Sequence, residues 1–360
     1  MNPLQTFIHG LNEPPASSEL AGSTAQQSRG ALAELLRQLR GGATLDEALF
    51  ARLDLLAYGC VLLRRSGRAP SSAAIHRYME ALANNLPLRG VLRQAGTALV
   101  EAGVRAIVYK GQDYLERIYG ELGARPMADV DLLVPEAELG RAERALLDAG
   151  FLADRACRLM HERKFCKDGI AIDLHHALLQ PDRMAVDHAE LFARAEPCTY
   201  APGLLVLEAT DALLVHCINQ TVKGYYLPPS SYLELQALLA HADPLLALHR
   251  AARYRASSAL YASLAALGEL GHAGARALSR RLNVSAARRR VLDAVIVRFA
   301  LSSLQREQPG RATMLAFKTT LIDDPIEAAR FVPRWFAWQM PFKAPRPLSC
   351  EPAAPRGPPS

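Results

Sequence analysis

The hydrophobic pattern of this chain changes twice, near residue 104 and again near residue 204, and this change constrains the fold more than any other feature. Outside that interval, apolar residues recur every three or four positions, as in ALAELLRQLR and LLVLEATDALLVHCINQ, which predicts amphipathic α-helices. Inside it stand the short apolar runs VRAIVY, ADVDLLV and GIAIDLHH, which are typical of buried strands. The sequence therefore predicts an α+β fold, in which a small mixed β-sheet core is flanked by N-terminal and C-terminal helical regions.

The same pattern divides the chain into five predicted segments. Both ends are rich in proline and small polar residues, which favours a flexible lead-in and a disordered tail. We expect a lead-in (1–30), an N-terminal helical region (31–103), the core (104–203), a C-terminal helical region (204–340) and a Pro-rich tail (341–360).

Composition sets broader limits on the class of protein. Half of the 360 residues are hydrophobic, which is enough for a sizeable core, and the net charge of +6 is only mildly basic. No run of about 18 apolar residues occurs, and MNPLQTFIHG lacks the basic and apolar parts of a secretory signal. Six scattered cysteines form no C-x-x-C pair, as expected for reduced thiols. We therefore expect a cytoplasmic protein without a membrane span.

Three aspartates occupy strand positions that suit a metal site. Asp129 and Asp131 are two apart in ADVDLLV, so both side chains point to the same side of the predicted strand. Asp173 and His175 share the polar side of IAIDLHH, which follows the hairpin signal Asp168-Gly169. If the two strands are neighbours, the three carboxylates converge. Hard oxygen ligands of this kind favour Mg²⁺, with Mn²⁺ as a substitute, and three carboxylates can hold two ions.

A lysine and a glycine precede these acids, where the first predicted strand ends. Lys110 and Gly111 form a strand–turn–helix junction with Gln112, and backbone N–H groups at a helix start favour a phosphate. Gly111 allows close approach of the backbone, and Lys110 supplies a positive charge. Arg125, in the loop before the acids, is a second candidate for a phosphate contact.

Taken together, the Lys-Gly step, RPMADVDLLV and IDLHH resemble the bacterial nucleotidyltransferase family proteins of the polymerase-beta-like superfamily, over roughly residues 95–240. The resemblance implies a minimal nucleotidyltransferase core that binds a nucleoside triphosphate. It also implies two Mg²⁺ ions held by Asp129 and Asp131, with Asp173 as the third acid, which helps to activate the hydroxyl of the acceptor. The chain departs from the wider superfamily at Gly111-Gln112, where Gly-Gly or Gly-Ser is usual.

The acceptor stays open, and so do three classes of function. The first is an enzyme that moves a nucleoside monophosphate onto a small molecule, a peptide or a protein. The second is an RNA-modifying enzyme such as a tRNA-modifying toxin, and the third is a non-catalytic binding protein that keeps the fold.

Several further polar residues are candidates for ligand contacts. The helical run LLVHCINQTVKGYY carries a polar stripe, of which Asn219 and Lys223 are candidate substrate contacts together with His175. A zinc site is a weaker alternative, because the spacing of the histidines matches no closed zinc pattern; its ligands would come from His161, His175, His176 and His188.

Overall fold

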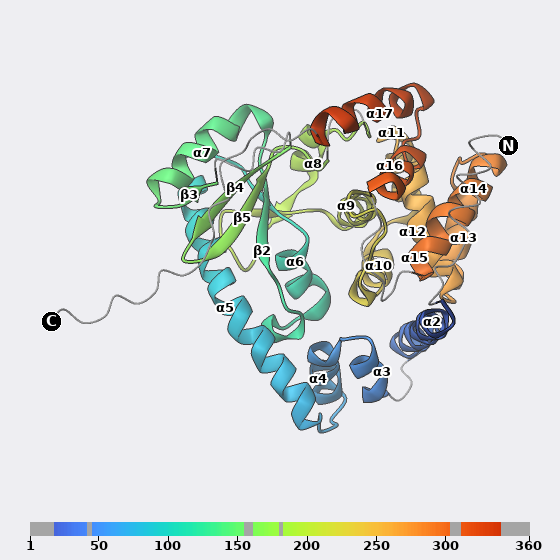
Figure 1. Cartoon of the computed structure of the whole chain (residues 1–360). Coiled ribbons are helices and arrows are strands. Elements are labelled where there is room, and N and C mark those ends of the chain that lie inside the picture. Colours follow the sequence, from blue (N-terminus) through green and yellow to red (C-terminus); the bar gives the residue numbers. More distant parts are fainter. Residues whose placement is uncertain (1–17, 42–44, 155–160, 180–182, 303–310, 340–360) are drawn as a thin grey trace.

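The computed structural model describes residues 18–41, 45–154, 161–179, 183–302 and 311–339. Within these ranges the predicted α+β fold is confirmed: one mixed sheet from the middle of the chain is flanked by helices from both ends (Figure 1). None of the described helices is both long enough and apolar enough to cross a membrane. Among the cysteines in the described ranges, Cys60, Cys198 and Cys217 are free thiols.

The N-terminal helical region starts earlier than predicted. Helix α2 begins at Ser18, inside the segment expected to be a flexible lead-in, because its second half buries Leu32 and Leu35 and the preceding residues continue the same helix. Helix α5 runs without interruption through Pro87. The helices of this region are α2 (Ser18–Gly41), α3 (Glu47–Arg52), α4 (Leu56–Arg65) and α5 (Ser72–Glu101).

The sheet has the strand order β3-β4-β5-β2-β1-β7-β6. The β2–β5 and β1–β7 pairs are parallel, and the other pairs are antiparallel, so the sheet is mixed as predicted. The predicted Asp168-Gly169 hairpin joins β4 to β5, and both turn residues have positive φ. The strands are β1 (Ile107–Val108), β2 (Asp129–Leu133), β3 (Leu152–Ala153), β4 (Glu162–Lys167), β5 (Ile170–His175), β6 (Glu196–Pro197) and β7 (Leu205–Val206).

One face of the sheet is apolar and is covered by α5 and α7 (Leu139–Asp148), which lie together on that side in Figure 1. Val130 and Leu132 of β2 and Ile172 of β5 are fully buried there against Leu92 of α5. Full burial of each such side chain stabilises the fold by about 1.5–3 kcal/mol. This layer fixes which side of each strand faces the core, and the alternate residues are left for the opposite face.

Short helical segments connect the strands, and a larger set of helices forms the C-terminal region. Helix α9 lies at the centre of that region, with almost every side chain buried, and α2 packs against α10 and α15. The connecting segments are α6 (Gly111–Tyr114), η1 (Leu115–Tyr119), η2 (Leu122–Ala124), η3 (Glu136–Glu138) and α8 (His188–Arg194). The C-terminal helices are α9 (Ala209–Val222), α10 (Pro229–His241), α11 (Pro244–Arg253), α12 (Ser257–Glu269), α13 (Ala273–Arg281), α14 (Ala286–Leu292), η4 (Asp293–Val297), α15 (Arg298–Ser302), α16 (Arg311–Thr320) and α17 (Pro325–Gln339).

Candidate active site

The face of the sheet opposite the apolar layer collects charged side chains from three adjacent strands. Asp131 lies opposite Asp173 in the parallel β2–β5 pair, and Lys164 lies opposite Asp173 in the β4–β5 hairpin. Alternate residues of each strand continue this face in both directions, because side chains in a strand alternate between its two sides. We call it the acidic face; it consists of Asp129 and Asp131 on β2, Asp173 and His175 on β5, and Glu162 and Lys164 on β4.

Asp131 is buried at the centre of the acidic face and contacts two cationic or polar partners. Its Oδ1 lies 2.6 Å from Nζ of Lys110 and 2.9 Å from Nε2 of His175. Burial opposes the charged form, but Lys110 and His175 outweigh that effect and hold the pKa of Asp131 well below its usual range. Asp131 is therefore an ionised carboxylate near neutral pH.

Asp173 is paired with a residue that the sequence analysis did not single out. Nζ of Lys164 lies 2.8 Å and 2.9 Å from the two carboxylate oxygens of Asp173. The pairing follows from the hairpin: a two-residue turn makes Lys167 and Ile170 partners, and stepping outward from them places Lys164 opposite Asp173. The signal for Lys164 was therefore present in the sequence.

Asp129 differs from the other two acids because it has no hydrogen bond or ion pair within the described part of the chain. It is half-buried at the start of β2. Burial, and then the like charges of Asp131 and Asp173, raise its pKa above the usual range. A bound cation would relieve that repulsion and would therefore stabilise the ionised carboxylate of Asp129.

The Lys110–Gly111 turn brings a lysine onto the acidic face in a strained conformation. Lys110 has φ of +58°, which is costly for a residue other than glycine. Its ammonium is directed to Asp131, and that carboxylate holds the pKa of Lys110 above its usual range against the effect of burial. At Gly111, which begins α6, an added Cβ would collide with the side chain of Met127. A larger residue at position 111 would therefore force the end of the Met127 side chain to move.

The loop that leads into β2 is held by α5. The side-chain amide of Asn85 donates to the carbonyl oxygens of Leu122 (2.6 Å) and Arg125 (2.7 Å). Its Oδ1 accepts the backbone N–H of Met127 at 3.1 Å. A helix of the N-terminal region therefore fixes the backbone immediately before Asp129.

Arg125 and Gln112, which the sequence predicts as nucleotide contacts, bind other side chains of the protein in this structure. Nε of Arg125 lies 2.7 Å from Oε1 of Glu234, a buried carboxylate of α10 that also accepts the hydroxyl of Tyr119 at 2.9 Å. Gln112 is buried and accepts a hydrogen bond from Nε of Arg89 at 3.1 Å. Local sequence could not reveal these pairs, because Glu234 and Arg89 lie on helices far away along the chain.

The polar stripe of α9 separates into a buried half and an accessible half. His216 is buried, with Nδ1 3.0 Å from the hydroxyl of Tyr114 and Nε2 2.9 Å from Nε2 of Gln220. Gln220 in turn accepts the hydroxyl of Ser263 at 2.7 Å. This half of the stripe links α6, α9 and α12 inside the protein.

Asn219 is half-buried and Lys223 is exposed. Desolvation, and then the positive charges of Lys110 and Arg125, lower the pKa of Lys223. Lys223 is therefore close enough to Lys110 and Arg125 for their positive charges to act on it.

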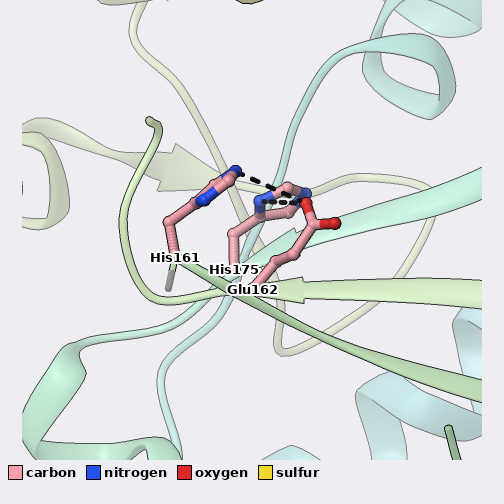
Figure 2. Close-up of side chains that lie close together, drawn as sticks. All are labelled: His161, Glu162 and His175. Carbon is pink, nitrogen blue, oxygen red and sulfur yellow. Dashed lines mark ion pairs between the residues drawn. The ribbon is translucent and has the colours of Figure 1, made fainter. Parts of the chain in front are cut away.

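Two overlapping groups of side chains could hold a metal ion among the described residues. One consists of Asp131, Asp173 and His175, and the other of His161, Glu162 and His175. The second group is drawn in Figure 2, where both imidazoles face the Glu162 carboxylate. Burial, and then the neighbouring His175, lower the pKa of His161 to about 4.

The predicted four-histidine zinc site does not form as a set. His161 and His175 lie close together, but His176 and His188 join neither metal-binding group of the described residues. His188 instead accepts a backbone N–H at 3.2 Å through Nε2.

Comparison with known proteins assigns the class that this sheet and its carboxylates define. Residues 48–271 match the family described as "Uncharacterised nucleotidyltransferase". The match covers more than half of the chain, and the protein therefore belongs to this nucleotidyltransferase family. The comparison with curated proteins finds no match.

Proposed function

We propose that the protein is a Mg²⁺-dependent nucleotidyltransferase of the polymerase-beta-like superfamily. It would move a nucleoside monophosphate from a nucleoside triphosphate to a hydroxyl group of an acceptor and release pyrophosphate. The observation that carries the proposal is the register that makes Asp131 and Asp173 direct neighbours, with Asp129 two residues along the same face, in a member of a nucleotidyltransferase family.

The three aspartates fit a pair of Mg²⁺ ions. All donors are carboxylate oxygens, and the repulsion felt by Asp129 is the cost that a cation removes. Asp129, Asp131 and Asp173 would hold the ions, with Mn²⁺ as an acceptable substitute. When bound, the ions would supply positive charge to the α-phosphate and to the departing pyrophosphate.

The remaining roles in the reaction are assigned to Asp173, Lys164 and Lys110. Asp173 accepts the proton of the attacking hydroxyl, while the new oxygen–phosphorus bond forms and the bond from the α-phosphorus to the pyrophosphate oxygen breaks. Lys164 contacts both oxygens of Asp173 and so fixes the orientation of that carboxylate. Lys110 and the backbone N–H groups that follow Gly111 are assigned to the β- and γ-phosphates.

Polar residues near the three aspartates are assigned to substrate contacts or to the orientation of a carboxylate. Lys223, exposed at the end of α9, is assigned as an acceptor or phosphate contact, with Asn219 one turn before it. His175 is assigned to orienting Asp131 rather than to the substrate, because its Nε2 is occupied by that carboxylate.

The test is transfer of label from α-³²P nucleoside triphosphates in the presence of Mg²⁺ and a cell extract. Label should enter a small molecule, a protein or RNA, and the labelled fraction identifies the acceptor class. Asp129→Asn and Asp173→Asn should each lower the rate by at least about 100-fold, since each removes a charge that acts on the transition state. Asp168→Asn is the matched control: it alters an exposed acid in the same hairpin and keeps an Asn-Gly turn, so activity should be unchanged. Equal loss in all three variants, or label transfer by Asp129→Asn at the normal rate, would refute the assignment.

A non-catalytic nucleotide-binding role is the second candidate. It is favoured by the ion pairs of Lys110 with Asp131 and Lys164 with Asp173, which offset two of the three acidic charges without a metal. A protein of this kind would bind a nucleoside triphosphate in Mg²⁺ and release no pyrophosphate with any extract. Its biological activity would also survive the double change Asp129→Asn and Asp131→Asn.

A further inference from the structure

His161, Glu162 and His175 form a buried cluster at one end of the acidic face, and of the three only His175, which orients Asp131, has a role in the proposed transfer reaction. All three side chains are more than nine-tenths buried. Glu162 and His175 are direct cross-strand partners in the β4–β5 hairpin, and His161 immediately precedes β4. The backbone carbonyl of His161 accepts the N–H of His176 at 3.0 Å, which fixes the chain there.

The hydrogen bonds of His175 determine which of its nitrogens carries the proton. Its Nε2 lies 2.9 Å from Oδ1 of Asp131, and an ionised carboxylate can only accept, so Nε2 must be the donor. A neutral imidazole then has a lone pair on Nδ1. That Nδ1 is buried, has no hydrogen-bond partner in the described part of the chain, and lies 3.5 Å from Oε2 of Glu162.

Nδ1 of His175 and Oε2 of Glu162 are therefore two lone-pair atoms that face each other in a buried place, and Nε2 of His161 is a third candidate ligand atom. Nε2 of His161 lies 3.7 Å from the same Oε2 of Glu162 (Figure 2). The other carboxylate oxygen of Glu162 is 3.8 Å from Nζ of Lys164, so Oε2 is the oxygen left for the imidazoles. Buried polar atoms arranged in this way are costly unless a proton or a cation lies between them.

We propose that His161, Glu162 and His175 bind a Zn²⁺ ion, with a fourth position open to water or to a substrate group. The three ligand atoms lie within 4.8 Å of one another. In a tetrahedral site with bonds of about 2.0–2.1 Å, ligand atoms are about 3.3 Å apart, close to the 3.5 Å and 3.7 Å separations found here. An octahedral site would need about 3.0 Å, which fits less well.

The donor set also separates this ion from those of the acidic face. Imidazole nitrogens with one carboxylate suit Zn²⁺, whereas Mg²⁺ prefers oxygen ligands alone. Asp131 accepts the far N–H of His175, the carboxylate–histidine–metal arrangement that orients a ligand imidazole. Asp131 thus connects the zinc site to the predicted Mg²⁺ site.

The test is metal binding to the full chain after removal of metals with a chelator, in the absence of nucleotide. Titration with Co²⁺ should give the visible absorption of a tetrahedral complex, and Zn²⁺ should displace it at one equivalent. His161→Ala and Glu162→Gln should each weaken Zn²⁺ binding by at least about 100-fold, and Asp131→Asn by about 10–100-fold. Zn²⁺ should also raise the melting temperature of the unaltered chain but not that of Glu162→Gln.

Two control variants show whether a loss of Zn²⁺ affinity is specific to the proposed ligands. His249→Ala removes an exposed histidine of α11 and should leave Zn²⁺ affinity unchanged, as should Asp129→Asn. If His161→Ala fails to fold, the nearly isosteric Glu162→Gln still reports on the site. Unchanged Zn²⁺ affinity in Glu162→Gln, or no tetrahedral Co²⁺ band in the unaltered chain, would overturn the proposal. The readout is independent of nucleotide transfer, so a failed transfer assay leaves the zinc proposal standing.

Discussion

At the residue scale, Lys110 holds the acidic face together. It accepts a backbone conformation that suits glycine, and the structure places its ammonium 2.6 Å from the buried carboxylate of Asp131. Strain of this kind, on the order of 1–3 kcal/mol, persists where surrounding contacts compensate for it and is common at functional sites. The ion pair with Asp131 is the compensating contact here.

Lys110→Met should therefore destabilise the protein by about 3 kcal/mol, because it leaves Asp131 buried with His175 as its remaining partner. Urea unfolding followed by circular dichroism measures the change in the free energy of unfolding. Arg77→Met is the control: Arg77 makes ion pairs with Asp54 and Glu80 on the surface, and its loss should cost about 0.5 kcal/mol or less. Equal effects of the two substitutions would show that the Lys110 pair contributes no more than a surface pair.

The residues of the acidic face show what local sequence can and cannot predict. Strand alternation placed Asp129, Asp131 and Asp173 on one side, and the register of β2 and β5 agrees with this. The hairpin turn also implied Lys164, although the sequence analysis did not use that step. Arg125 could not be placed from its neighbours, since its partner Glu234 comes from a helix of the other flank.

At the scale of elements, the junction between β1 and α6 is set by close packing. Gly111 begins α6 directly against Met127, in the loop that precedes β2. This contact joins the turn that carries Lys110 to the strand that carries Asp129 and Asp131. The sequence predicted a glycine turn here for phosphate approach, and the packing against Met127 is an additional constraint that no local pattern could reveal.

Gly111→Ala should cost about 1–3 kcal/mol, because the new methyl group would overlap the Met127 side chain and force it to move. The double variant Gly111→Ala with Met127→Ala should show a favourable coupling, since the second change removes the obstacle. Gly140→Ala is the matched control: nothing lies within 4 Å of its added Cβ, and an alanine in α7 should be neutral or stabilising by up to about 1 kcal/mol. Thermal unfolding is compared for the unaltered protein, Gly111→Ala, Met127→Ala, the double variant and Gly140→Ala. Additive costs of the two single changes in the double variant would contradict a steric origin.

At the scale of the whole molecule, helices from both flanks position the acidic face. Asn85 of α5 and Glu234 of α10 hold the loop that enters β2 from opposite ends of the chain. The sheet core and its helical flanks were predicted from the periodicity, whereas this bridging was not, because it depends on contacts between residues far apart in sequence. The proposed boundaries at residues 103 and 203 therefore mark the positions where the hydrophobic pattern of the sequence changes. That each helical region is a separate structural unit remains a proposal.

The last two described helices, α16 and α17, are in contact through Lys318, a lysine that is buried from solvent. Lys318 of α16 lies over the ring of Trp335 in α17, with Nζ 4.6 Å from the ring centroid. Burial, and then the positive charge of Arg183, lower the pKa of Lys318 to about 8. The usual value is 10.5, so the folded state holds this proton less tightly than the unfolded state does.

The sign of the pH dependence follows from that difference. Between about pH 8 and pH 10.5 the unfolded chain binds more protons at Lys318, so this group's cost to stability is full at neutral pH and disappears as pH rises through that window. Lys318→Met removes the cost and should raise the free energy of unfolding at pH 7 by about 1–3 kcal/mol, the lower figure allowing for the lost contact with Trp335. The advantage of the variant over the unaltered protein should shrink toward zero near pH 10.5, as measured by urea unfolding at a series of pH values. A stability difference that is constant across this range would mean that Lys318 is as well solvated in the folded protein as in the unfolded chain.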